Sequence, residues 1–385
     1  MPKHLVLVGA GHAHLTVMKE MAGIVARGHQ VTVVSTGGYQ YYSGMGPGML
    51  SGRYRPAEIR FDAATMVTER GGTFLEDRVT RIDPRRQSLT LASGRQIAYD
   101  VLGLNTGSHV PFPSPEATSV RIYPAKPVEI FVEARAYVAA QLAERQLQIV
   151  VAGGGPAGVE IAANARALVQ RHRGRATVTL LARGSLLPHF VSTVRRKALV
   201  KLKQLDIHVM ENTGLSAIDD QDLLLASGER LDCDILFPAV GTRPAALIEA
   251  AGFKVDGQGG LLVNRHLQSV SHPNVFGGGD CIGFQPRPLQ RVGVYAVRQN
   301  PVLFHNLTAA LEGGPLENFE PQHVYLLILN MGDGTGILNR GRLTFGGRAA
   351  FWLKHFIDER FMRRFQLSGE LHKDHASPPG GAHPA

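Results

Sequence analysis

Apolar positions near the start of the chain change their spacing twice, and the changes predict a strand, a helix and a second strand. A continuous apolar run covers residues 4–8. In the stretch that follows, Leu15, Met18 and Ala22 recur at the spacing of one helix face. A second apolar run then covers residues 31–34. The order strand, helix, strand is typical of parallel strands in a doubly wound sheet.

The same order of spacings returns in the middle of the chain. An apolar run at 148–152 precedes a helical pattern at 159–169, and a further run lies at 177–181. Each unit has a glycine-rich turn between its first strand and its helix. We therefore predict an α/β protein with two Rossmann-like domains, each a doubly wound, three-layer dinucleotide-binding unit, plus a small C-terminal region.

Proline-rich and polar stretches indicate where these domains begin and end. Prolines recur between Pro111 and Pro127, which indicates a linker, and the end of the chain is rich in Ser, Pro, Gly and His. The predicted boundaries are 1–110 and 241–312 for the two parts of the first domain, 111–147 for a linker and helix, 148–240 for the second domain, 313–365 for the C-terminal region and 366–385 for a disordered tail.

Composition adds two features, an excess of glycine and a positive charge. Of 385 residues 44 are glycine, above an average usage of ~7%, which indicates loops or backbone that passes close to a ligand. The 41 Lys and Arg residues against 32 Asp and Glu give a net charge of +9, which suits an anionic ligand, a membrane surface or nucleic acid. Because the basic residues are dispersed and no recognition module occurs, nucleic acid is not an expected partner.

The two cysteines are too few for a disulfide scaffold or a Cys-rich metal site. We therefore expect a cytoplasmic protein without a metal centre. The first apolar run is short and is followed by Gly9 and Gly11, unlike a signal peptide. The sequence contains no stretch of ~20 apolar residues free of charge, so we predict no helix that spans a membrane.

The first glycine-rich turn carries Gly9 and Gly11, which can bring backbone N–H groups close to a pyrophosphate. His14 occupies the position of the third glycine in such turns. Ser35 stands where an acidic residue that binds the ribose is expected. Taken alone, this turn is equally consistent with an ordinary connection between a strand and a helix.

The second turn has the complete pattern, with Gly153, Gly155 and Gly158. The strand after it is followed by Ala182 and Arg183, so a carboxylate is again missing. Arg183 either accommodates a 2′-phosphate, which would favour NADP(H) over NAD(H), or is a solvated loop residue.

A third motif covers residues 274–281, where a strand ends in small residues and delivers Asp280 after Gly279. A carboxylate at this place can accept hydrogen bonds from a hydroxylated chain, while the glycines let the backbone pass close to that chain. Taken alone, the motif is also compatible with an aspartate in a loop.

In this order, the motifs resemble those of the FAD-dependent pyridine nucleotide oxidoreductases with two dinucleotide-binding domains. In that family the first turn binds FAD, and a Thr-Gly pair matches Thr106-Gly107. The carboxylate of the Gly-Asp motif, here Gly279-Asp280, holds the ribityl chain of FAD. The second turn receives NAD(P)H, and a Gly-Thr-Arg-Pro stretch begins at Gly241. The resemblance implies FAD as cofactor and NAD(P)H as substrate.

Within this family, the chain is similar to type II NADH:quinone oxidoreductases. It also resembles the flavoprotein domain that some bacteria fuse ahead of selenophosphate synthetase. The second likeness rests on the stretches 9–15, 42–49 and 295–299. That relative also lacks the carboxylate after the second strand, so Ser35 is compatible with FAD.

Members of the family that depend on cysteine are disfavoured. Disulfide reductases and sulfide:quinone oxidoreductases use a cysteine pair at the flavin, whereas Cys233 lies in the apparent nicotinamide domain and Cys281 adjoins Asp280. We expect both thiols to be small buried residues. Direct hydride transfer from NAD(P)H is the remaining chemistry, for which the protein supplies positioning and electrostatics.

The resemblance also points to residues beside the flavin. In the quinone reductases, the segment that matches 294–299 lies next to the flavin and the quinone tunnel, with Gln299 as the family glutamine and Tyr295 on the approach. Glu160 matches an acidic residue near the nicotinamide site. The alternative for the segment 294–299 is a helix that only packs under the flavin. The alternative for Glu160 is a glutamate that the helix dipole favours in a first helical turn.

Residues 346–365 predict an amphipathic helix. Its large apolar residues have helical spacing: Leu353, Ile357 and Phe361, extended by Trp352, Phe356 and Phe365. Basic residues fill much of the remainder, as in helices that lie in a membrane interface, and the segment resembles the membrane-binding end of the type II dehydrogenases. The alternative is a helix packed on the sheet or in a homodimer interface.

We therefore predict an FAD-dependent NAD(P)H dehydrogenase that passes electrons to a quinone or similar small acceptor at the inner face of the cell membrane. Glu160 and Gln299 are its predicted catalytic residues. Two alternatives stay open, a soluble flavoenzyme of selenium or sulfur metabolism and a flavin-binding partner protein with a degenerate nicotinamide site.

Overall fold

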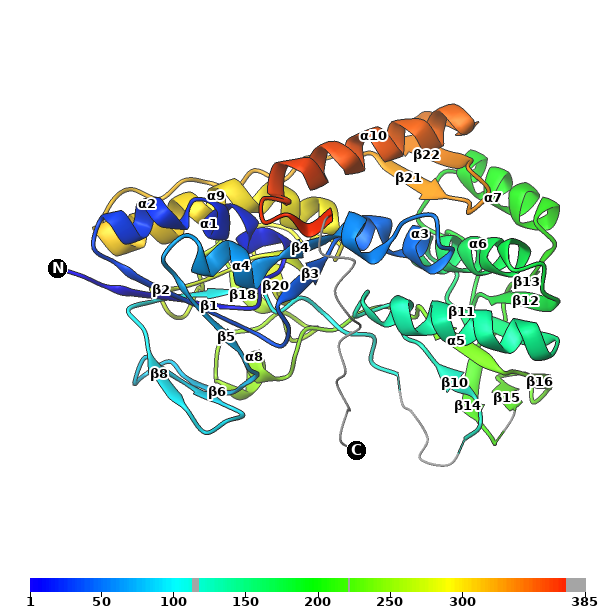
Figure 1. The fold of residues 1–385 in the computed structure, drawn as a ribbon, viewed down its shortest axis with the longest axis horizontal. Helices are drawn as coiled ribbons and strands as arrows, with labels where there is room; N and C mark the ends of the chain where they lie inside the picture. Colours follow the sequence, from blue (N-terminus) through cyan, green and yellow to red (C-terminus); the bar gives the residue numbers. More distant parts are fainter. Residues whose placement is uncertain (113–117, 221, 372–385) are drawn as a thin grey trace.

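Two parallel sheets with helices packed on them organise the chain, and a three-stranded C-terminal sheet with a helix after it connects the two units (Figure 1). The computed structural model describes residues 1–112, 118–220 and 222–371. The α/β fold with parallel sheets that the sequence predicts is confirmed.

The first sheet has the strand order β19-β9-β1-β2-β5, with all pairs parallel. Its strands are β1 (His4–Val8), β2 (Gln30–Ser35), β5 (Thr73–Glu76), β9 (Val101–Leu104) and β19 (Val275–Gly277). The central strands are buried almost throughout, which is why they are continuous apolar runs. Helices α1 (Leu15–Lys19), α2 (Met21–Ala26) and α9 (Gly293–Glu312) lie along one side of this sheet (Figure 1).

Small antiparallel and helical elements complete the first unit. The strands are β3 (Tyr39–Tyr41) with β4 (Arg60–Asp62), the sheet of β6 (Val79–Asp83), β7 (Ser88–Leu91) and β8 (Gln96–Ala98), and the parallel pair β18 (Leu261–Val263) with β20 (Ile282–Phe284). The helices are η1 (His12–His14), η2 (Ser43–Met45), α3 (Gly46–Leu50), η3 (Pro56–Ile59), α4 (Ala63–Thr68), α8 (Leu247–Ala250) and η4 (Gly279–Cys281).

The second sheet repeats the parallel design with the order β10-β17-β11-β12-β13. Its strands are β10 (Arg121–Ile122), β11 (Leu147–Ala152), β12 (Ala176–Leu181), β13 (Ile207–Met210) and β17 (Ile235–Pro238). The unit also contains α5 (Ile130–Glu144), α6 (Pro156–Arg171), α7 (Ser192–Gln204) and the antiparallel strands β14 (Leu215–Ile218), β15 (Asp222–Leu225) and β16 (Arg230–Asp232). The stretch expected to be a linker and helix thus supplies β10 and α5, and its residues 113–117 lie outside the described part.

The C-terminal region bridges the two units. Strands β21 (Leu327–Asn330), β22 (Gly336–Arg340) and β23 (Leu343–Gly347) form an antiparallel sheet that leads into α10 (Arg348–Phe365). In Figure 1, α10 starts on this sheet beside the second unit and ends, in red, over the first unit.

The chain stays ordered for a short distance after α10. The Gln366 side chain donates hydrogen bonds to the carbonyl oxygens of Ala57 and Arg60, and buried Glu370 accepts one from Asp62 N at 3.1 Å. The tail expected from residue 366 onward is therefore corrected for 366–371, because these side chains satisfy backbone groups of the first unit. Residues 372–385 lie outside the described part.

Candidate functional site

A cavity of about 460 Å³ lies at the carboxyl ends of the first sheet's strands, the edge at which open parallel sheets bind ligands. Most residues predicted to bind FAD line it: Gly9, Gly11, Ser35, Thr106, Gly107, Gly279 and Asp280. The fold therefore brings together residues from distant parts of the chain around one space of the size that small ligands and cofactors occupy, ~300–1,000 Å³.

The glycines in the cavity wall are required for different physical reasons. A Cβ on Gly9 would lie 2.3 Å from the carbonyl oxygen of Asn105, and a Cβ on Gly11 would lie 1.7 Å from Asn105 Oδ1. Both glycines are therefore required by packing within the protein. A Cβ on Gly107, in contrast, would have no atom within 4 Å, and this residue faces the cavity. The φ of Gly107 is +68°, so its backbone conformation favours glycine, and the open space beside it leaves room for a ligand.

Asp280 lies at one end of the cavity and is 8% exposed. Its Oδ2 accepts a hydrogen bond from the Ser108 hydroxyl at 2.8 Å and forms an ion pair with Lys126. Burial alone would raise the pKa of this carboxyl, but Lys126 and Ser108 outweigh burial and hold the pKa below its usual value. An ionised acceptor therefore faces the cavity. No motif marks Lys126 in the sequence, so this residue is an addition from the structure.

The two histidines of the first turn lie on different sides of it. His12 lines the cavity, and within the described chain its Nε2 has no hydrogen-bond partner. His14 is fully buried, and its Nδ1 lies 2.7 Å from the carbonyl oxygen of Gly9. Burial lowers the pKa of both rings to about 4, so both are neutral near pH 7. The structure thus moves the expected ligand contact from His14 to His12, because His14 supports the turn from behind.

Helix α9 contributes to the site in two ways. Gln299 is 1% exposed, and its Oε1 accepts a hydrogen bond from the backbone N–H of Gly279 at 2.7 Å. It therefore holds the Gly-Asp turn in place. The ring of Tyr295 packs edge-on against Tyr325, with centroids 5.9 Å apart, and is not part of the cavity wall, whereas Ala296 is.

These residues fit an elongated, negatively charged dinucleotide that carries hydroxyl groups. Backbone N–H groups of the first turn suit a pyrophosphate, and ionised Asp280 suits a hydroxylated chain. Lys126 adds a cation beside that carboxylate, and the unpartnered Nε2 of His12 offers a further polar contact. FAD is a ligand of this kind.

The second glycine turn leads into α6 and repeats the packing of the first. A Cβ on Gly153 would lie 2.3 Å from the carbonyl oxygen of Ala239, and a Cβ on Gly158 would lie 1.8 Å from that of Gly153. Gly155, the N-cap of α6, and Gly241 both have open space around a Cβ position. The N-terminus of this 16-residue helix is therefore accessible to a pyrophosphate.

Arg183 follows β12 and is exposed. A Cβ on Gly214 would lie 3.4 Å from its Cγ. The neighbouring strand β13 is followed by Glu211, whose carboxylate accepts a hydrogen bond from Leu186 N and pairs with Arg195 at 2.6 Å. This carboxylate is thus already bonded, and no ion pair engages Arg183 in the described ranges.

Glu160 lies in α6, where the second unit meets the C-terminal sheet. Its Oε1 accepts a hydrogen bond from Asn330 N at 2.8 Å, and the Asn164 side chain donates to the carbonyl oxygen of Asn330 at 3.2 Å. Burial raises the pKa of Glu160 to about 7, against the opposing effect of Lys354. Glu160 can therefore exchange a proton near neutral pH.

Helix α10 places a buried ion pair within the field of Glu160. Lys354 Nζ lies 2.6 Å from Asp358 Oδ2, and the two side chains are 13% and 6% exposed. Lys354 also donates to the carbonyl oxygen of Gly44 at 2.6 Å, and Asp358 Oδ1 accepts from the Tyr42 hydroxyl at 3.1 Å. Burial alone would lower the pKa of Lys354, but Asp358 and Glu160 raise it. Sequence reasoning missed this pair, whose one sequence signal is its i, i+4 spacing.

The large apolar residues of α10 divide between two faces. Phe351, Met362 and Phe365 are buried, and the ring of Phe361 packs against that of Tyr42 at 4.8 Å between centroids. The opposite face carries exposed apolar residues: Trp352, Leu353, Phe356 and Ile357. The structure therefore divides the single apolar face expected from the sequence, because the inner face of α10 packs on the C-terminal sheet and on the first unit.

Both cysteines are buried. The Sγ of Cys281 lies 3.4 Å from the carbonyl oxygen of Leu104, to which it donates. Burial raises the pKa of Cys233 to about 12 and that of Cys281 to about 11. Thiolates are therefore scarce at neutral pH, and these residues are unsuited to thiol-based redox chemistry.

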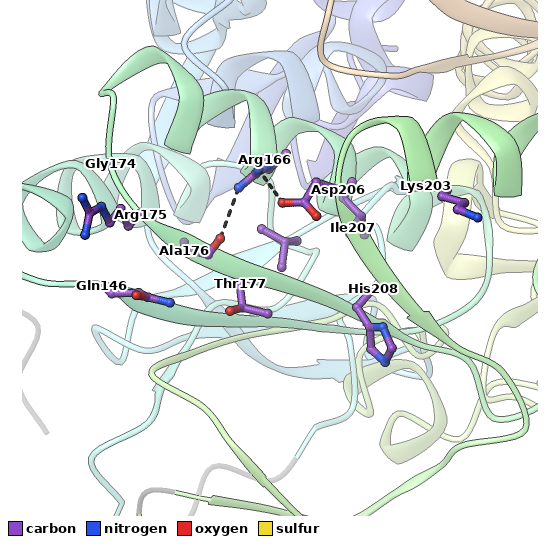
Figure 2. Close-up of a pocket in the computed structure, with 11 residues that line it drawn as sticks. Gln146, Arg166, Gly174, Arg175, Ala176, Thr177, Lys203, Asp206, Ile207 and His208 are labelled. Atoms are coloured by element: carbon purple, nitrogen blue, oxygen red, sulfur yellow. Dashed lines mark hydrogen bonds and ion pairs between the residues drawn. The ribbon is translucent and has the colours of Figure 1, made fainter.

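Another hollow, of about 580 Å³, lies at the amino-terminal edge of the second sheet, where β12 begins at Ala176 (Figure 2). Arg166 is already bonded there, since it donates to the carbonyl oxygen of Ala176 at 3.1 Å and pairs with Asp206 at 2.8 Å. None of the predicted site residues lines this hollow. It is therefore separate from the candidate site.

Comparisons with known proteins agree with this geometry. A family model described as pyridine nucleotide-disulphide oxidoreductase matches residues 3–303. Ferroptosis suppressor protein 1 of Taeniopygia guttata is 28% identical over 289 residues, which cover 70% of this chain and 72% of the relative. Type II NADH:quinone oxidoreductase NdhA of Mycobacterium tuberculosis is 31% identical over 158 residues, which cover 36% of this chain and 34% of the relative.

A solved structure shows the same fold. NDH2 from Plasmodium falciparum, in complex with NADH, has a TM-score of 0.78 at 14% identity, with 94% of this chain and 96% of that chain covered. The family model spans both glycine turns and the Gly-Asp motif. The chain therefore belongs to the pyridine nucleotide-disulphide oxidoreductase family and uses FAD together with NAD(P)H.

Proposed function

We propose that this chain takes a hydride from NAD(P)H and passes the electrons to a quinone or a similar small acceptor. One observation carries the proposal, a chain of contacts that leads from the FAD cavity towards Glu160. The ring of His12, which lines the cavity, contacts the ring of Tyr42. The Tyr42 hydroxyl in turn binds Asp358, which with Lys354 forms the buried ion pair near Glu160. The relative named above as a type II NADH:quinone oxidoreductase supports the choice of acceptor.

The residues have separate roles in this reaction. FAD supplies the chemistry that accepts a hydride and releases electrons. Asp280 and Lys126 bind its polar part, and Gln299 acts through the Gly279 N–H that it holds. The open N-terminus of α6, at Gly155, binds the pyrophosphate of NAD(P)H.

Quinone reduction consumes one proton more than the hydride brings. The balance is NAD(P)H + quinone + H⁺ → NAD(P)⁺ + quinol. Glu160, whose pKa is about 7, and Lys354 are the groups that supply this proton. The donor's O–H or N–H bond breaks as an O–H bond of the quinol forms, and solvent restores the proton to the donor.

Arg183 favours NADPH as the nucleotide. It stands two residues after the end of β12, where a carboxylate would select NADH, and it is exposed. The nearby carboxylate of Glu211 is bonded to Arg195, so it does not neutralise Arg183. A guanidinium at this place suits a 2′-phosphate.

The exposed face of α10 makes contact with a membrane surface, from which a quinone enters. Its residues are Trp352, Leu353, Phe356 and Ile357, and Arg360, Arg363 and Arg364 follow in the same helix. Aromatic and aliphatic side chains beside arginines are typical of helices that lie in the interface of an anionic bilayer. Among the described helices, none has the length and apolarity needed to cross a bilayer.

The test is an anaerobic titration of the purified protein, followed by the visible absorbance of its flavin. We expect NADPH or NADH to bleach the flavin band with one equivalent, and a soluble short-chain quinone to restore it. Bleaching that the quinone does not reverse would exclude the proposed acceptor. A flavin that neither nucleotide bleaches would exclude NAD(P)H as the electron donor.

A further inference from the structure

Asp358 is a carboxyl side chain that is buried in an ion pair with Lys354. It is 4% exposed and lies on the inner face of α10. Burying an ion pair removes two charges from water, and apolar residues of similar volume often give equal or greater stability. The groups that this carboxylate binds therefore indicate its role.

Each carboxylate oxygen of Asp358 has a partner that carries a proton. Oδ2 binds the Lys354 ammonium at 2.6 Å, and Oδ1 accepts from the Tyr42 hydroxyl at 3.1 Å. The two donors come from different parts of the fold, since Tyr42 precedes η2 of the first unit. Asp358 is thus bonded to both donors.

This arrangement reaches the rim of the FAD cavity. The Tyr42 ring contacts the His12 ring edge-on, with centroids 5.5 Å apart, and His12 lines the cavity. Ser43, the next residue after Tyr42, also lines it. Lys354 is anchored at the same place, because its Nζ donates to the carbonyl oxygen of Gly44.

The titratable groups around Lys354 come from three parts of the fold. Helix α10 supplies Asp358, α6 supplies Glu160, and Tyr54 follows α3. The next residues along α10 after Lys354 and Asp358 are His355 and Glu359, and His355 Nε2 lies 3.2 Å from Glu359 Oε1. His355 Nδ1 lies 3.2 Å from the Tyr54 hydroxyl. Of these groups, Asp358 is the one that bonds Lys354 directly.

We propose that Asp358 is a positioning residue for proton delivery to the acceptor: it holds the Lys354 ammonium and the Tyr42 hydroxyl beside His12 and Ser43, which line the cavity. This inference rests on the proposed function. The proton leaves the N–H bond of Lys354 as the O–H bond of the quinol forms, and Lys354 regains a proton from solvent, directly or by way of Glu160.

The test separates the two half-reactions of the complete holoprotein by rapid mixing. In Asp358→Asn we expect flavin bleaching by NAD(P)H to stay within about twofold of wild type, since no hydride contact is lost. Reoxidation by a soluble short-chain quinone should slow about tenfold or more, a part of what general acid catalysis contributes.

The pH profile distinguishes positioning from a merely structural role. The charge of Asp358 raises the pKa of Lys354, so its removal makes Lys354 lose its proton at lower pH. The alkaline limb of the reoxidation rate should therefore move about one unit towards acid, within the shift that a close opposite charge causes. Asp358→Glu, which keeps the charge, should restore the wild-type profile.

Two further variants complete the design. Asp333→Asn removes the partner of Lys201 in another partly buried pair, at 2.5 Å, and should leave both half-reactions unchanged. Tyr42→Phe removes the hydrogen bond to Asp358 and keeps the ring, so it tests the same arrangement if Asp358→Asn does not fold. It should slow reoxidation by the quinone and leave flavin bleaching unchanged.

Reoxidation at the wild-type rate in Asp358→Asn, or equal slowing of both half-reactions in the variants that fold, would overturn the assignment of Asp358. Failure of the proposed function looks different, because then the wild-type protein itself would not be reoxidised by the quinone.

Discussion

Gly11 and Gly155 occupy matching positions in the two glycine turns, yet they are glycine for different reasons. A Cβ on Gly11 would overlap the Asn105 side chain at 1.7 Å, whereas Gly155 has nothing within 4 Å. The third position differs as well. A Cβ on Gly158 would lie 1.8 Å from the carbonyl oxygen of Gly153, but His14 bonds the carbonyl oxygen of Gly9. One motif thus combines requirements of packing with requirements of ligand approach.

Arg183 leads to a prediction about a single side chain. Arg183→Ala should raise KM for NADPH about tenfold and leave KM for NADH within twofold, because a charge-assisted hydrogen bond to a 2′-phosphate contributes ~1.5–3 kcal/mol. Steady-state kinetics with both nucleotides measure this. Arg86→Ala, at an exposed arginine of the first unit, is the control. Equal changes in both KM values would remove the role given to Arg183.

Helix α10 shows how one element serves two environments. Its inner face carries Phe351, Met362 and Phe365 with the Lys354–Asp358 pair, and its outer face carries four exposed apolar side chains. Apolar spacing alone does not separate these faces, since both contain large residues within the same turns. Contact with the C-terminal sheet and with β4 determines which face is buried.

The outer face leads to a prediction for this element. Replacing Trp352 and Phe356 together by Ser should weaken binding to vesicles of phosphatidylglycerol and phosphatidylcholine at least tenfold, because burial of each ring contributes ~1.5–3 kcal/mol. Vesicle co-sedimentation measures this. The thermal midpoint should change little, since both side chains are more than half exposed. Val132→Ser, at an exposed residue of α5, should bind like wild type, and retained binding by the double variant would contradict a membrane role for this face.

Three parts of the molecule meet around Glu160. The residue itself belongs to α6 of the second unit, Asn330 to the C-terminal sheet, and the Lys354–Asp358 pair to α10, which is bonded to Tyr42 of the first unit. Protonation of one carboxyl is therefore coupled to the contact between the units. A group that titrates near pH 7 at such a place makes the stability of the whole fold depend on pH.

The sign of this dependence can be predicted. Burial raises the pKa of Glu160 from 4.5 to about 7, so the folded state binds the proton more tightly than the unfolded state. The stabilising contribution is complete below pH 4.5 and is lost as the pH rises towards 7 and beyond. Relative to wild type, Glu160→Gln should gain thermal stability between pH 4.5 and 8.

Thermal midpoints measured across this range check the prediction, with Glu144→Gln, at an exposed residue of α5, as the control. A difference between Glu160→Gln and wild type that is constant with pH would show that Glu160 does not titrate in this range.

Local sequence patterns are sufficient to predict the parallel strands, both glycine turns and the Gly-Asp motif. These features are local, because side-chain period and turn geometry depend on residues a few positions apart. Three contacts depend on packing between distant elements: Lys126 pairs with Asp280, His12 rather than His14 faces the cavity, and Asp358 binds Tyr42. Residues 154 or 316 positions apart become neighbours through the packing of whole elements, and no local period encodes that packing.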